Sequence, residues 1–181
     1  VASFSLVVGG LSLWAFAPRP GAPVAGRYRR FDVHAHVAPD GVARAARLFA
    51  AHGIDRVVNL SGGHDAAHIA TSVAAARSVG RGWLVFANLD WTDALGPGWV
   101  EQQVAWVERA KNLGARGLKI QKALGLGVLD LAGRRVAVDD PRLDPIFEAA
   151  GTLGLPVSMH IGDPKAFFDP PTPANERYEE L

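Results

Sequence analysis

Two histidines separated by one residue end an apolar run in the segment FDVHAH at residues 31–36. Side chains alternate between the two faces of a β-strand, so His34 and His36 would point to the same side. A buried imidazole pair without a hydrogen-bond partner is costly, and one metal ion about 2.0–2.1 Å from each nitrogen would satisfy both. A structural pair satisfied by hydrogen bonds is the alternative. Because a turn into a helical stretch follows directly, we favour the metal site.

A third histidine, His160, ends the apolar run PVSMH at residues 156–160. Alone, a histidine at a strand end is more often satisfied by a hydrogen bond than by a metal. If the strands are parallel, however, their carboxyl ends lie on one face, and His160 would join His34 and His36 there. Three histidines from two strand ends would form part of the shell of a catalytic zinc ion. The chain has no cysteine, so histidines, carboxylates or a lysine derivative would have to hold the metal.

Further polar residues lie within or just after apolar runs. Lys119 is inside one run, where a buried lysine is costly unless it is paired or modified. A lysine that reaches solvent or pairs with an acid is an equally good interpretation. Asn88 and Asp90 follow another run and could bring an amide and a carboxylate to the site. His64 follows a third run on the same side, and Asp65 beside it is expected to cap the next helix.

Short apolar runs and helical stretches alternate after Arg30. The expected strands are residues 31–36, 56–60, 84–88, 116–121 and 156–161, and the expected helices are 41–51, 66–79, 99–113 and 142–153. A glycine follows each helical stretch, as expected of a helix stop. This alternation, at intervals of about 25–35 residues, is typical of parallel β/α units. An open doubly wound sheet and part of a closed eight-stranded barrel both fit it.

Residues 122–141 are too many for a tight loop between a strand and a helix. Apolar residues at 128–131 and 135–138 flank a turn with Gly133 at its centre, which predicts a small hairpin. The insertion would follow the fourth strand, at the end where barrel active sites lie. We expect a lid or a loop that faces the substrate.

The amino-terminal residues 1–26 differ from the rest. Residues 4–17 carry no charge, and a linker rich in proline and glycine follows. Fourteen residues are too few for a membrane-spanning helix of about 20, but they suit the apolar core of an export signal, about 7–15 residues long. We expect a signal or a membrane anchor and a periplasmic or extracellular location. A buried first element in a cytoplasmic protein is the alternative.

The charges of the chain nearly balance, with 19 basic and 18 acidic residues. No basic run alternates with aromatic residues, so we expect no nucleic-acid partner. A small-molecule substrate is expected instead. Arg27, Arg29 and Arg30 form the densest basic cluster and are expected to be solvated charges beside a strand.

Three motifs together resemble the amidohydrolase superfamily, in particular its amidohydrolase-2 branch, which includes proteins like aminocarboxymuconate-semialdehyde decarboxylase. They are FDVHAH at 31–36, GLKIQK at 117–122 and PVSMHIGDP at 156–164, in the order that the family has them. The resemblance covers about residues 30–181. It implies an α/β fold, a (β/α)8 TIM-type barrel, of which residues 27–181 would supply about the first five units.

The resemblance also implies a divalent metal, expected to be zinc, held by His34, His36 and His160. In the family the ion activates a water that attacks a carbonyl, or it supports decarboxylation. Lys119 matches the position at which some members carry a carbamylated lysine between two metals. The family's remaining ligand, an aspartate of the eighth strand, would lie beyond Leu181.

We therefore expect a fragment of a metal-dependent hydrolase or lyase that is inactive by itself. A five-stranded part of a barrel would have two open edges, and these could pair with a second copy of the chain. The alternative function is a non-catalytic exported β/α module that binds a metal or a partner.

Overall fold

The computed structural model describes residues 29–160, 162 and 165–179 of the chain. The expected signal or anchor at residues 1–26 lies outside this part. Among the residues described, no helix is both long enough and apolar enough to cross a bilayer.

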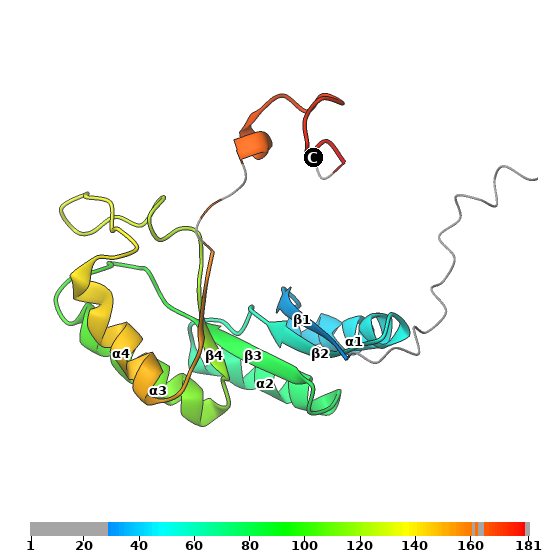
Figure 1. Ribbon diagram of the computed structural model, residues 1–181. Helices are drawn as coiled ribbons and strands as arrows, with labels where there is room; N and C mark the ends of the chain where they lie inside the picture. Colours follow the sequence, from blue (N-terminus) through cyan, green and yellow to red (C-terminus); the bar gives the residue numbers. More distant parts are fainter. Residues whose placement is uncertain (1–28, 161, 163–164, 180–181) are drawn as a thin grey trace, which may run out of the picture.

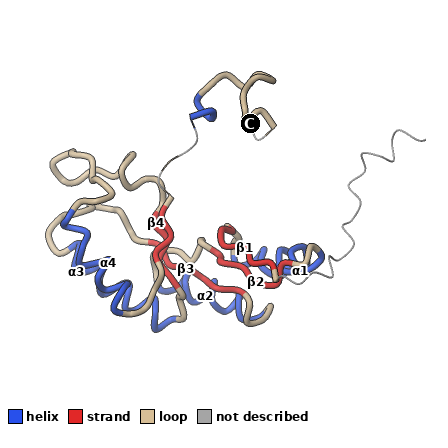
Figure 2. The backbone as a smooth tube through the Cα atoms, viewed as in Figure 1, coloured by secondary structure: helices blue, strands red, loops and turns tan. Residues whose placement is uncertain are grey.

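Strands and helices alternate along the described chain, as the sequence predicts (Figures 1 and 2). The strands are β1 (Arg30–Ala35), β2 (Ile54–Asn59), β3 (Trp83–Asn88), β4 (Gly117–Ile120) and β5 (Val157–Met159). The α-helices are α1 (Val42–Ala51), α2 (Ala66–Ser78), α3 (Trp99–Leu113) and α4 (Asp144–Thr152). Three short 3-10 turns lie at η1 (Pro39–Gly41), η2 (Pro141–Leu143) and η3 (Lys165–Phe168).

The five strands are all parallel and follow one another in the order β1-β2-β3-β4-β5. The helices form a row beside the sheet, in which α2 packs on β3 and on α3, and α3 packs on α4 (Figure 1). A doubly wound sheet would reverse its strand order and carry helices on both faces. Consecutive order and a curled sheet with an outer row of helices are features of a barrel wall. The described chain is therefore a partial β/α barrel, as the resemblance implies.

Local signals place the helix ends where the sequence predicts them. The side chain of Asp65 accepts hydrogen bonds from the backbone N–H groups of Ala67 and His68, at 2.9 and 2.8 Å, and so caps α2. Four glycines take positive φ angles after the four α-helices: Gly53 at 73°, Gly80 at 119°, Gly114 at 111° and Gly154 at 64°. Both features confirm the expected boundaries to within a few residues.

The largest core cluster lies between the sheet and helices α3 and α4. Leu118 and Ile120 of β4 are fully buried there against Val107 of α3 and Ile146 of α4. Each such aliphatic side chain stabilises the fold by about 1.5–3 kcal/mol through burial. The cluster fixes β4, the strand that carries Lys119, and so it gives the site a rigid base.

Most elements begin or end one or two residues from their expected bounds. Strand β5 is shorter than the predicted 156–161, although the N–H of His160 still donates to the carbonyl of Ile120 at 3.0 Å and continues the ladder. Helix α4 begins only at Asp144, because Pro141–Leu143 forms a 3-10 turn. The segment 122–141 consists mainly of turns, with a single antiparallel bridge between Leu129 and Arg135.

Candidate metal and catalytic site

The two histidines of the first motif converge at the carboxyl end of β1. The Nε2 atoms of His34 and His36 lie 3.3 Å apart, and their ring centroids are 5.2 Å apart. Two nitrogens bound tetrahedrally to one zinc ion at about 2.0–2.1 Å would be about 3.3–3.4 Å apart. The observed spacing therefore suits two neighbouring ligands of one ion.

A buried asparagine at the end of β2 holds the chain that leaves His36. Asn59 is only 1% exposed, and its Oδ1 accepts hydrogen bonds from the N–H groups of Val37 and Ser61, at 3.1 and 3.2 Å. Its Nδ2 donates to the carbonyl of Val37 at 2.8 Å. These three bonds tie the end of β1 to the end of β2 and fix the backbone next to His36.

Ser61 orients the ring of His36. The Nδ1 of His36 lies 3.0 Å from the hydroxyl oxygen of Ser61. If Nδ1 carries the proton and donates it to that oxygen, Nε2 keeps its lone pair for a metal. Neither Asn59 nor Ser61 was identified from the sequence. A polar residue that ends an apolar run is the signal that could have found Asn59.

His160 reaches the same region from β5. Its ring centroid is 6.4 Å from that of His34, and its Nε2 lies 3.1 Å from the carbonyl oxygen of Gly162. Among residues 29–160, 162 and 165–179, no group of three histidine, cysteine or carboxylate side chains is placed to hold a metal ion. His34 and His36 are therefore placed to supply two ligands of one metal ion. The ring of His160 would have to turn away from Gly162 to supply the third ligand.

Lys119 lies at the centre of β4 and pairs in register with Asn88 of β3 and Ser158 of β5. It is 2% exposed, and within the described part of the chain its Nζ has no hydrogen-bond partner. Burial lowers the pKa of this amine, which increases its neutral fraction. A buried amine without a partner is costly, and such a cost is often tolerated at a functional site.

The electrostatic environment of His36 favours the neutral imidazole. Partial burial, followed by the charges of His34, Lys119 and His160, lowers the pKa of His36. All three of these neighbours are basic, and a like charge opposes protonation. A neutral imidazole is the form that binds a metal, so the lowered pKa of His36 leaves its ring ready to bind a metal ion.

Asn88, the last residue of β3, forms hydrogen bonds with the loop that follows β2. Its Oδ1 accepts from the N–H of Gly63 at 2.9 Å, and its Nδ2 donates to the carbonyl of Leu60 at 3.2 Å. The amide therefore ties this loop to β3, and both of its polar groups are engaged with the backbone. In this arrangement Asn88 positions the segment that contains Ser61.

Asp90 lines a hollow to which none of His34, His36 and His160 contributes. This hollow, of about 440 Å³, is also lined by Trp99, Gln102 and Leu131. The pKa of Asp90 is lowered mainly by hydrogen bonds from the backbone and the side chain of Thr92, with a smaller contribution from the charge of His64. The structure therefore places Asp90 within electrostatic range of His64.

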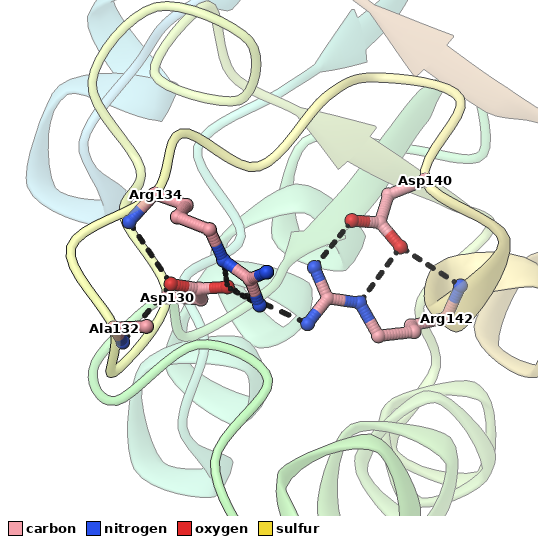
Figure 3. Close-up of polar contacts among 5 residues, drawn as sticks. All are labelled: Asp130, Ala132, Arg134, Asp140 and Arg142. Atoms are coloured by element: carbon pink, nitrogen blue, oxygen red, sulfur yellow. Dashed lines mark hydrogen bonds and ion pairs between the residues drawn. The ribbon is translucent and has the colours of Figure 1, made fainter.

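The insertion after β4 is fixed by a network of ion pairs, shown in Figure 3. Asp130, whose side chain is only 4% exposed, accepts from the N–H groups of Ala132 and Arg134 and from the guanidinium of Arg134. Arg142 contacts the same carboxylate at 3.5 Å and pairs with Asp140 at 2.6 Å. The network joins the turn of the insertion to the residues that lead into α4.

A wall of parallel β/α units with converging histidines at its carboxyl edge defines a barrel-type protein with a candidate metal site. The chain belongs to the amidohydrolase family, whose sequence model, described as amidohydrolase, matches residues 31–176. No match was found among curated proteins.

Solved structures similar to this chain at low sequence identity include two from different proteins. The carboxyl transferase domain of Rhizobium etli pyruvate carboxylase, solved with pyruvate and biocytin, is 18% identical with a TM-score of 0.46, over 69% of this chain and 20% of that one. The apo structure of Agrobacterium tumefaciens ATU3138 is 20% identical with a TM-score of 0.44, over 76% of this chain and 50% of that one. The chain thus spans half or less of the length of either protein.

Proposed function

We propose that this chain carries the metal-binding half of a metal-dependent hydrolase, or of a related decarboxylase of the amidohydrolase-2 branch. The observation that carries the proposal is the 3.3 Å spacing of the Nε2 atoms of His34 and His36. Membership of the amidohydrolase family supports it. A divalent metal, which we propose to be zinc, would supply an acidified water for attack on a carbonyl.

The residues of this chain would take distinct roles. His34 and His36 would bind the metal through Nε2, and His160 would be the third ligand. Lys119, with its lowered pKa, is proposed to accept a proton at Nζ or to be carbamylated there. Ser61 would hold the ring of His36 in the tautomer that binds the metal.

The two remaining predicted site residues, Asn88 and Asp90, are proposed to act without binding the metal. We propose that Asn88 keeps the loop after β2 in place, because its amide bonds Gly63 and Leu60. Asp90 is ionised at neutral pH and faces a hollow of about 440 Å³, where it could meet the part of a small-molecule substrate that is remote from the reacting bond.

The uncharged segment 4–17 supports the further proposal that the protein is exported or membrane-anchored. Within the described residues β1 and β5 are the edge strands of the sheet, which supports the proposal of a homo-oligomer. Phe31 and Val33 on β1 and Val157 on β5 are 44%, 61% and 39% exposed, so both edges have apolar surface to bury.

The metal content of the purified protein tests the proposed function. We expect about one zinc ion per chain by plasma mass spectrometry after dialysis against a weak chelator. The double variant His34→Ala/His36→Ala should lose it, and His160→Ala should bind zinc more weakly. His52→Ala is the matched control, because His52 is exposed at the end of α1, before β2 begins.

Two results would contradict the proposal. Folded wild-type protein could remain free of metal after zinc is supplied, or His52→Ala could reduce the metal content as much as the double variant. Circular dichroism spectra that match the wild type would establish that each variant is folded.

A further inference from the structure

A second hollow lies at the opposite end of the sheet from the histidines. It has a volume of about 440 Å³ and is formed where α2 leads into β3 and α3 leads into β4. Its ten lining residues include Arg77, Arg81 and Arg116. Three are arginines and none is acidic, which distinguishes this hollow from the one at Asp90.

Other arginines in the described part of the chain have acidic partners. Arg29 pairs with Asp55, and Arg142 pairs with Asp140. Within the described part of the chain, no carboxylate lies at ion-pair distance from Arg77, Arg81 or Arg116, the three lining arginines.

The side chain of Arg77 on α2 reaches across to the carboxyl end of α3. A Cβ atom built on Gly114 would lie 3.0 Å from Nη2 of Arg77 and 2.9 Å from Cγ1 of Val73. The guanidinium of Arg77 therefore lies directly over this glycine. Gly114 also has a φ of 111°, which disfavours any residue with a side chain. A glycine at this position therefore leaves space for the guanidinium of Arg77.

The charge of the hollow suits a dianion. Three guanidinium groups contribute a charge of three, and the carboxyl ends of α2 and α3 offset about half a charge each. The remaining charge of about +2 matches a phosphate monoester near neutral pH. The planar fork of arginine binds phosphate oxygens in pairs, which makes it the cation best suited to such a group.

The size and the other lining residues favour an organic phosphate over a bare anion. A volume of about 440 Å³ is within the range of small-molecule sites, about 300–1,000 Å³. Val73, Ala76 and Leu84 supply an apolar surface for the organic part. Trp83 also lines the hollow, and its ring stacks on that of Phe49 with centroids 5.8 Å apart.

We propose that the hollow at the amino ends of β3 and β4 binds a small organic phosphate monoester through Arg77, Arg81 and Arg116. The site is separate from the candidate metal site, because the two lie at opposite ends of the parallel strands. It does not depend on the proposed hydrolase function, and the His34→Ala/His36→Ala variant should bind the ester as the wild type does.

Phenyl phosphate is a suitable probe, with inorganic phosphate as its reference, in isothermal titration calorimetry at constant ionic strength. We expect phenyl phosphate to bind at least tenfold more tightly than inorganic phosphate. Arg81→Ala and Arg116→Ala should each weaken binding about tenfold, as expected for the loss of one charge-assisted contact. Arg116→Glu should abolish it. Arg109→Ala is the matched control, since Arg109 is exposed on α3 and lines none of the hollows described.

Three outcomes would overturn the proposal. Phenyl phosphate could fail to bind to folded protein. Inorganic phosphate could bind equally tightly, which would reduce the site to an anion patch. Arg109→Ala could weaken binding as much as Arg116→Ala, which would show general attraction to positive charge. Exposed arginines rarely support folding, so these variants should keep the wild-type melting temperature.

Discussion

Replacement of Asn59 by alanine should weaken both the fold and the metal site. The substitution removes the three hydrogen bonds to Val37 and Ser61 and leaves their backbone groups without partners. A typical hydrogen bond contributes about 1 kcal/mol net, so we expect a loss of about 3 kcal/mol in the free energy of unfolding. The loss should be close to this sum, because Asn59 is 1% exposed and water reaches it poorly.

The same substitution should lower zinc affinity about 10–100-fold, the usual range when a residue that supports a metal ligand is lost. The reason is geometric, because Asn59 fixes the backbone that follows His36 and the N–H of Ser61, the residue that orients the ring of His36. Asn59→Asp retains the acceptor for two N–H groups but places a second carboxylate oxygen, an acceptor, against the carbonyl of Val37. Because the position is also buried, this variant should destabilise the fold at least as much as alanine.

Urea denaturation of metal-free protein measures the first effect, and competition with a zinc chelator measures the second. Asn112→Ala is the control, since Asn112 is exposed near the end of α3 and its replacement should change stability by less than about 0.5 kcal/mol. If Asn59→Ala matches this control in stability and binds zinc like the wild type, the hydrogen bonds of Asn59 to Val37 and Ser61 do not position the metal site.

Lys119→Met should raise the free energy of unfolding by about 1–3 kcal/mol, because it removes a buried amine that has no hydrogen-bond partner among the described residues. The same substitution should abolish the activity of an assembled enzyme. Unchanged or lower stability in urea would contradict this prediction. In metal-free protein, the lowered pKa of His36 means that the unfolded chain binds its proton more readily. Stability should thus be highest above about pH 6.5 and fall as the pH drops toward the folded-state value, less so in His36→Gln; identical pH profiles in urea would refute this. Asp130→Asn should weaken the ion pair with Arg134 and so speed cleavage by trypsin within residues 122–141. Asp93→Asn is the control, because Asp93 is exposed and its replacement should not change the rate of cleavage.

The sequence predicted the alternation of elements but not the order of the strands. Hydrophobic spacing reports which residues are buried, and it is the same in a barrel wall and in a doubly wound sheet. The pairing of β2 with β3 together with that of β3 with β4 separates the two, because the common doubly wound orders lack one of these pairs. The resemblance to amidohydrolases, by contrast, predicted a barrel, because three motifs in order carry information that periodicity lacks.

The candidate site could be predicted in part for a similar reason. His34 and His36 were found because alternation along a strand puts them on one side. Asn59 and Ser61 were missed, because they act through backbone groups and through a ring nitrogen that no spacing reveals. The sequence placed Asn88 at the end of a strand but could not show that its amide bonds Leu60 and Gly63.

The two buried asparagines connect each loop of the site to the next strand along the sheet. Asn59 of β2 holds the residues after β1, and Asn88 of β3 holds the loop that contains Ser61, which in turn aims His36. A growing chain would therefore present a well-aimed histidine pair only once β3 has docked, although both histidines lie in β1 or just after it. Zinc that binds this pair would stabilise the first three β/α units as one block, and its uptake would report their assembly.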